Sequence, residues 1–172
     1  MKKLFALLLA LCLLGSFAMA ETTEVTEVNW ADVEGAASEV GGQFVTVEAL
    51  SMAFWLPEGF VQSELTEDQE AMGFFAIFNA EDNSGRIGMQ FIEADGADVM
   101  DVIGEIEGAS DAEPMLVNGL SCVNFDMKDM DATCLAFGTQ NGNILVITFA
   151  PMSNADFAAK AMLVVASIQS AE

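Results

Sequence analysis

Three aspartates whose side chains could bind a cation surround one lysine in a short stretch of the chain. They are Asp126, Asp129 and Asp131, and Lys128 lies among them. Ca²⁺ prefers carboxylate oxygens, but it takes about six to eight of them. This stretch offers too few ligands, its spacing matches no EF-hand loop, and a lysine interrupts it. We therefore favour a solvated acidic hairpin tip over a metal site, and we expect no cofactor.

Pairs of carboxylates could also act as the acid and base of a hydrolase. The chain has 27 acidic residues, so many pairs will lie close together by chance, and nothing marks one pair as special. It has no histidine, which excludes a Ser-His-Asp triad, a His-ligated zinc and a histidine pH switch. We expect no enzyme activity. A carboxylate-dependent hydrolase and a Ca²⁺-stabilised surface protein are the alternatives.

Aromatic residues supply a third kind of candidate site. Phe54 and Trp55 lie close in sequence to Phe60, and such side chains can line a ligand cleft. Residues that alternate along a strand also fill cores, and we favour packing over ligand contact for these three. Trp30 shares one face of a predicted helix with apolar residues, so we interpret it as a packing anchor.

Two cysteines of the predicted mature chain lie on either side of a predicted hairpin. If the turn is centred on Lys128, Cys122 faces Cys134 across the two strands. Directly opposite residues have Cβ atoms about 4.5–5.5 Å apart, which a disulfide can nearly span. A disulfide is one prediction for this pair, and two buried free thiols are the alternative.

The first 20 residues have the pattern of a signal peptide. Two lysines precede an apolar run over Leu4–Leu14, and small residues before Glu21 predict cleavage between Ala20 and Glu21. The apolar run is too short to span a bilayer. We therefore expect a secreted protein without a membrane span. Residues 21–28 are predicted to be a flexible acidic spacer, and residues 29–172 a single domain.

The charge of the predicted mature chain limits its partners. The full chain has a formal net charge of −22, and removal of the two N-terminal lysines with the signal leaves 3 − 27 = −24. Three basic residues cannot neutralise many phosphates, so nucleic acid is not an expected partner. We expect any protein partner to be basic or neutral, and the protein itself to be a monomer.

The elements that must position these residues follow from periodicity and turn signals. Helices are predicted over residues 30–40 after Asn29, from Asp98 onward, and near the C-terminus after a capping sequence at residues 153–156. Two strands with a bend near Leu50 and Ser51 are predicted in residues 43–56, and further strands in residues 72–79, 86–93, 115–117, 120–126, 131–138 and 144–150. Most strands form hairpins, and the last is apolar on both faces. The predicted fold is therefore an α/β protein of the α+β type, a mainly antiparallel sheet with helices on both faces (an α/β/α sandwich).

This order of elements resembles the PsbP-like fold. The resemblance covers residues 43–170 and rests on four segments: residues 54–60, 117–119, 142–149 and 166–168. These motifs are structural, and small secreted bacterial proteins of unknown function look similar. The resemblance implies a binding or accessory domain, and it carries over no catalytic residue.

Overall fold

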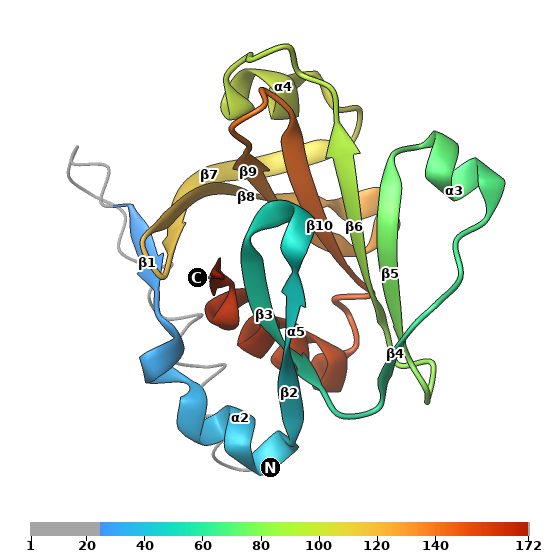
Figure 1. Cartoon of the computed structure of the whole chain (residues 1–172), viewed down its shortest axis with the longest axis vertical. Helices are drawn as coiled ribbons and strands as arrows, with labels where there is room; N and C mark the ends of the chain where they lie inside the picture. Colours follow the sequence, from blue (N-terminus) through green and yellow to red (C-terminus); the bar gives the residue numbers. More distant parts are fainter. Residues whose placement is uncertain (1–24, 172) are drawn as a thin grey trace.

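The computed structural model describes residues 25–171 (Figure 1). The predicted signal peptide, its cleavage site and residues 21–24 lie outside the described residues. A mixed α+β fold is present, with one large sheet, one small sheet and few helices. The helices and 3-10 turns are η1 (Trp30–Asp32), α2 (Glu34–Val40), η2 (Glu48–Leu50), α3 (Glu67–Ala71), α4 (Val99–Glu105), η3 (Lys128–Met130) and α5 (Ala155–Ser167).

The large sheet has eight strands in the order β1-β7-β8-β9-β10-β6-β5-β4. Its members are β1 (Thr26–Val28), β4 (Phe60–Gln62), β5 (Phe74–Ala80), β6 (Arg86–Ile92), β7 (Ala109–Val117), β8 (Leu120–Met127), β9 (Ala132–Gly138) and β10 (Ile144–Ala150). All neighbours are antiparallel except β1, which runs parallel to β7. The prediction of a mainly antiparallel sheet is confirmed.

Strand β1 corrects the prediction of a flexible spacer. Residues 26–28 pair with residues 115–117 of β7, and the Val28 carbonyl accepts a hydrogen bond from the Asn118 N–H at 2.9 Å. The pairing joins segments about 90 residues apart in sequence, so no local pattern could indicate it. The spacer prediction is therefore wrong for these three residues.

The two strands predicted in residues 43–56 belong to a second sheet and not to the first, together with a short C-terminal strand that was not predicted. This small sheet consists of β2 (Gly42–Val47), β3 (Met52–Pro57) and β11 (Gln169–Ser170), in the order β11-β3-β2. All six residues of β3 are buried. Phe54 belongs to the main core, while its neighbour Trp55 packs on the opposite side against α2 and α5. Strand β3 is therefore buried inside the molecule, while most of β2 is exposed.

The main core lies between one face of the large sheet, strand β3 and helix α5. Phe54, Ile147 and Phe157 represent these three layers, and each is almost fully buried. Residues from the other face of the sheet pack against α4, of which Ile103 is fully buried. One face is thus covered by a helix together with a second sheet, which differs from the helical layers of the expected sandwich.

Local signals set the helix ends at several places. Thr66 and Gln69 form a capping box at the start of α3, and Asp98 accepts the Met100 N–H at the start of α4. Asn154 accepts two N–H groups at the start of α5. Asn29 makes no side-chain cap, contrary to the prediction. The Trp30 N–H instead donates to Oδ1 of Asn118 at 2.8 Å, across 88 residues of sequence.

The register of the β8–β9 hairpin overturns the disulfide prediction. Phe125 pairs with Cys134, and Val123 pairs with Ala136, because η3 and a left-handed Asp131 (φ 50°) lengthen the turn. The register differs from the predicted one by an odd number of residues, which places Cys122 and Cys134 on opposite faces of the sheet. Cys122 belongs to the main core and Cys134 to the core beneath α4. Both are buried free thiols, which agrees with the alternative.

Candidate functional site

The three predicted ligand-cleft residues lie in different places. Phe54 is fully buried and packs edge-on against Phe78, with ring centroids 5.8 Å apart. Phe60 is buried beside Phe157, and Nζ of Lys160 lies 5.9 Å from the centroid of its ring. Of the three, Trp55 alone lines a surface hollow. The structure therefore does not bring these residues together into one cleft.

Trp55 lines a hollow of about 430 Å³ together with Trp30 and Phe44. We call it the aromatic hollow. The ring of Trp30 is edge-on to that of Phe44, with centroids 5.3 Å apart, and lies 6.1 Å from the ring of Trp55. The other lining residues are Glu34, Ala37, Ser38, Gly41, Gly42 and Gln43.

Two long-range pairings bring these rings together. Phe44 in β2 lies directly opposite Trp55 in β3, so both side chains are on the same face of the small sheet. The hydrogen bond from the Trp30 N–H to Asn118 holds the chain entering η1 close to this face. The sequence favoured a packing role for Trp30, and neither contact leaves a local signal that would have placed it in a site.

Two glycines keep the hollow open beside the rings. A Cβ atom at Gly42 would lie 2.5 Å from the Trp55 ring and from the Leu56 carbonyl oxygen, which no real structure tolerates. At Gly41, where φ is 80°, a Cβ atom would lie 2.8 Å from Oε2 of Glu58. The Glu58 carboxylate therefore lies next to the backbone that forms one wall.

The chemistry of this wall favours a positively charged occupant. Three aromatic side chains and Glu34 line the hollow, the Glu58 carboxylate lies beside Gly41 of its wall, and no basic residue is among the lining residues. Ring faces attract cations within about 6 Å, most strongly at tryptophan. Between residues 25 and 171 the ion pair found joins Lys128 to Asp111, so neither glutamate is paired.

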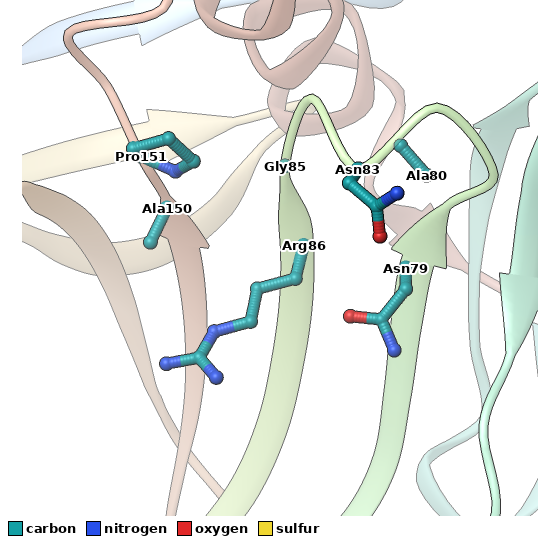
Figure 2. Close-up of a pocket in the computed structure, with 7 residues that line it drawn as sticks. All are labelled: Asn79, Ala80, Asn83, Gly85, Arg86, Ala150 and Pro151. Carbon is teal, nitrogen blue, oxygen red and sulfur yellow. The ribbon is translucent and has the colours of Figure 1, made fainter.

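A second, smaller hollow of about 310 Å³ lies where β5, β6 and the end of β10 meet. Figure 2 shows the Arg86 guanidinium and the Asn79 carboxamide on the same side of the sheet. The Asn79 amide donates to Oγ of Ser63, and Arg86 is exposed with no ion-pair partner in the described part of the chain. No side chain that lines this hollow is both charged and buried, so the hollow has no preorganised charged group to bind a ligand.

The aspartates of the hairpin tip have separate partners. Asp126 accepts a hydrogen bond from the Thr133 hydroxyl at 2.8 Å, and Asp131 accepts the Ser153 N–H at 2.9 Å and the Ser153 hydroxyl. Lys128 does not interrupt the cluster but pairs with Asp111 at 2.6 Å, which lowers the pKa of that carboxyl. Among residues 25–171, no three acidic, cysteine or histidine side chains are arranged to hold a metal.

Comparisons with known proteins define the fold. No family model and no curated protein matches the chain. The solution structure of cyanobacterial PsbP (CyanoP) from Synechocystis sp. PCC 6803 is similar with a TM-score of 0.56 at 12% identity, over 76% of this chain and 93% of that one. A structure from Bacteroides thetaiotaomicron has a TM-score of 0.46 at 13% identity, over 76% of this chain and 49% of that one. The chain has a PsbP-like fold.

Membrane insertion by a helix finds no support in the described residues. No helix between residues 25 and 171 has the length and apolar character that crossing a bilayer requires.

Proposed function

We propose that this protein is an exported, non-catalytic binding or accessory domain that takes a positively charged group into the aromatic hollow. The observation that carries the proposal is the set of three rings with two unpaired glutamates beside them and no cation among them. A PsbP-like fold is in keeping with an accessory or binding role. The occupant's chemistry is that of a lysine or arginine side chain, or of a small organic ammonium ion.

The charge of the whole chain supports the same class of partner. With 27 acidic and five basic residues, the field of the molecule attracts cations over long distances and speeds their arrival. The same field repels nucleic acid and a second copy of the chain. A basic partner and a monomeric protein follow from this argument.

Tryptophan fluorescence tests the proposal directly. The chain has two tryptophans and no tyrosine, and both tryptophans line the hollow. Emission therefore reports on this site alone. We expect tetramethylammonium to change the emission with a saturating curve and to bind more weakly in high salt. tert-Butanol, a neutral molecule of similar size in which a hydroxyl replaces one methyl group, should have no such effect.

A matched pair of variants locates the effect. Phe44→Ala removes one ring of the hollow and is expected to weaken tetramethylammonium binding by about three- to tenfold. Phe75→Ala removes a ring that stacks on Phe91 outside the hollow, and it should leave the affinity unchanged. Equal affinities for wild type and Phe44→Ala would contradict the proposal.

The non-catalytic part of the proposal has its own test. The purified domain is expected to show no turnover in a broad screen of ester, peptide, phosphate and glycoside substrates. Turnover that is abolished by replacing a single aspartate or glutamate with its amide would instead establish the carboxylate-dependent hydrolase.

A further inference from the structure

Strand β2 is an open sheet edge with unusual composition for this chain. It is the outer strand of the small sheet, and Gly42, Gln43, Phe44 and Thr46 are exposed. Its sequence, Gly-Gln-Phe-Val-Thr-Val, has no charge and no proline in a chain with 27 acidic residues. Charged residues, proline or a bulge protect most natural edge strands from pairing with another chain. This edge has none of these protections.

The pairing pattern identifies the backbone groups that face outward. The Glu58 N–H donates to the Gly41 carbonyl at 3.0 Å, in the same register that joins β2 to β3. Hydrogen-bonded pairs alternate along an antiparallel ladder, so Gln43, Val45 and Val47 bond to β3. The N–H and C=O groups of Phe44 and Thr46 therefore point away from the sheet.

We propose that an extended, basic segment of a partner polypeptide adds to β2 as a further strand and places a lysine or arginine side chain in the aromatic hollow. This inference rests on the proposed function. A residue opposite Phe44 on an added strand has its side chain on the face of Phe44 and Trp55. The main-chain hydrogen bonds supply affinity, and the hollow selects the cation.

Charge complementarity distinguishes this occupant from a second copy of the chain. Two copies paired through β2 would bring together two strongly acidic molecules, and β2 has no basic residue to place in a hollow. A basic segment instead meets Glu34, which lines the hollow, and approaches Glu58, which lies beside Gly41. Phe44, which is 44% exposed, would gain cover from the added strand.

The probe is a capped nine-residue peptide of alternating threonine and lysine. Its control has the same sequence and charge, but the backbone amide nitrogens of its lysines are methylated. Methylation removes the backbone N–H groups that would face Phe44 and Thr46. We expect the first peptide to change tryptophan emission and the N-methylated peptide to bind at least tenfold more weakly. Hydrogen exchange should slow at the Phe44 and Thr46 amides, and remain unchanged at Val45, which already bonds to β3.

Variants of Thr46 supply the matched protein control. Thr46→Pro removes one outward N–H without removing a bond of the β2–β3 ladder, since proline is tolerated at sheet edges. We expect it to weaken peptide binding about tenfold, while Thr46→Ser binds as wild type does. Both should still bind tetramethylammonium, which shows that the hollow is folded. If Thr46→Pro does not fold, strand addition is tested by comparing the two peptides on the wild-type protein and by hydrogen exchange at the Phe44 and Thr46 amides.

The outcomes separate this inference from the proposed function. Equal binding of both peptides would overturn strand addition, while tetramethylammonium binding would still support the hollow. A wild-type dimer that Thr46→Pro dissociates would assign the edge to a second copy and overturn the partner proposal. If neither tetramethylammonium nor the peptide changes the emission, both proposals are wrong.

Discussion

Asn118 connects three segments of the chain through one side chain. Its Oδ1 accepts the Trp30 N–H, and its Nδ2 donates to the carbonyls of Ala166 and Ile168, all at 2.8 Å. The two carbonyls belong to the C-terminal end of α5, where intrahelical partners run out. The residue also has φ 47°, which asparagine tolerates better than most residues. Asn118 therefore positions Trp30 at the aromatic hollow.

Replacing Asn118 should destabilise the fold in two separable ways. Asn118→Ala loses three hydrogen bonds and puts alanine at positive φ, so we expect a loss of about 2–4 kcal/mol in the free energy of unfolding. Asn118→Gly loses the same bonds but accepts the backbone conformation, and it should be about 1 kcal/mol less destabilising. Urea denaturation measures both. Equal stability of Asn118→Ala and wild type would contradict the assigned role.

The two buried cysteines should make the free energy of unfolding depend on pH in the alkaline range. Burial raises the pKa of Cys122 to about 12, and burial is also the main cause that raises the pKa of Cys134 to about 11. In the unfolded chain thiols lose their protons near pH 9, so between pH 9 and pH 11 the unfolded state binds fewer protons than the folded state. The free energy of unfolding should therefore fall as pH rises through this range, by at most about 1.4 kcal/mol per pH unit for each thiol.

Urea denaturation at pH 7, 8, 9 and 10 checks this expectation. A variant with Cys122→Ala and Cys134→Ala should lose the part of the alkaline slope that the thiols cause. The same alkaline slope in both proteins would contradict the assigned role of the thiols.

The absence of a disulfide is a separate prediction. Intact mass with and without reductant should be identical, because the two thiols lie on opposite faces of the sheet.

At the scale of elements, α5 docks onto the turn before β6. Phe157 in its first turn is fully buried, and a Cβ atom at Gly85 would lie 2.1 Å from the Phe157 ring. Asn154 also donates to the Ser84 carbonyl at 3.2 Å. The glycine is therefore required by the close approach of the helix to the turn.

Two glycine-to-alanine variants test this account with opposite signs. Gly85→Ala must displace the Phe157 ring and should lower the free energy of unfolding by about 1–3 kcal/mol. Gly104→Ala lies within α4, where an added Cβ atom meets nothing within 4 Å, and should raise it by up to about 1 kcal/mol. Thermal unfolding ranks the three proteins. A Gly85→Ala protein as stable as wild type would contradict the close packing.

The elements that could be predicted from the sequence are those with local signals. The capping box at Thr66, the Asn118-Gly119 hairpin and the amphipathic stripe of α4 depend on neighbouring residues alone. Strand β1, and the pairing of β11 with β3 in the small sheet, depend on contacts between distant segments, which periodicity does not encode. The predicted register of the β8–β9 hairpin was wrong because a 3-10 turn lengthens the hairpin tip. Trp55 was a candidate from its type, but its grouping with Trp30 and Phe44 depends on tertiary contacts.

At the scale of the whole molecule, uncompensated negative charge dominates the electrostatics. The chain has 27 acidic residues. Within residues 25–171, one of them forms an ion pair, namely Asp111 with Lys128, and both side chains are exposed. Like charges on the folded surface repel one another more than in an expanded chain, which destabilises the compact state. The same field that attracts a basic partner therefore lowers the stability of the free protein.

Added salt should relieve this repulsion. The Debye length falls to about 10 Å at 0.1 M salt, so NaCl is expected to raise the melting temperature at neutral pH. The rise should be roughly 2–4 °C for each kcal/mol of repulsion that is screened. CaCl₂ at matched ionic strength should act as NaCl does, because Asp126 and Asp131 are engaged with Thr133 and Ser153. A much larger rise with CaCl₂, abolished by replacing Asp126, Asp129 and Asp131 with asparagine, would establish a calcium site at the tip. An unchanged melting temperature in both salts would show that surface repulsion does not limit the stability of this fold.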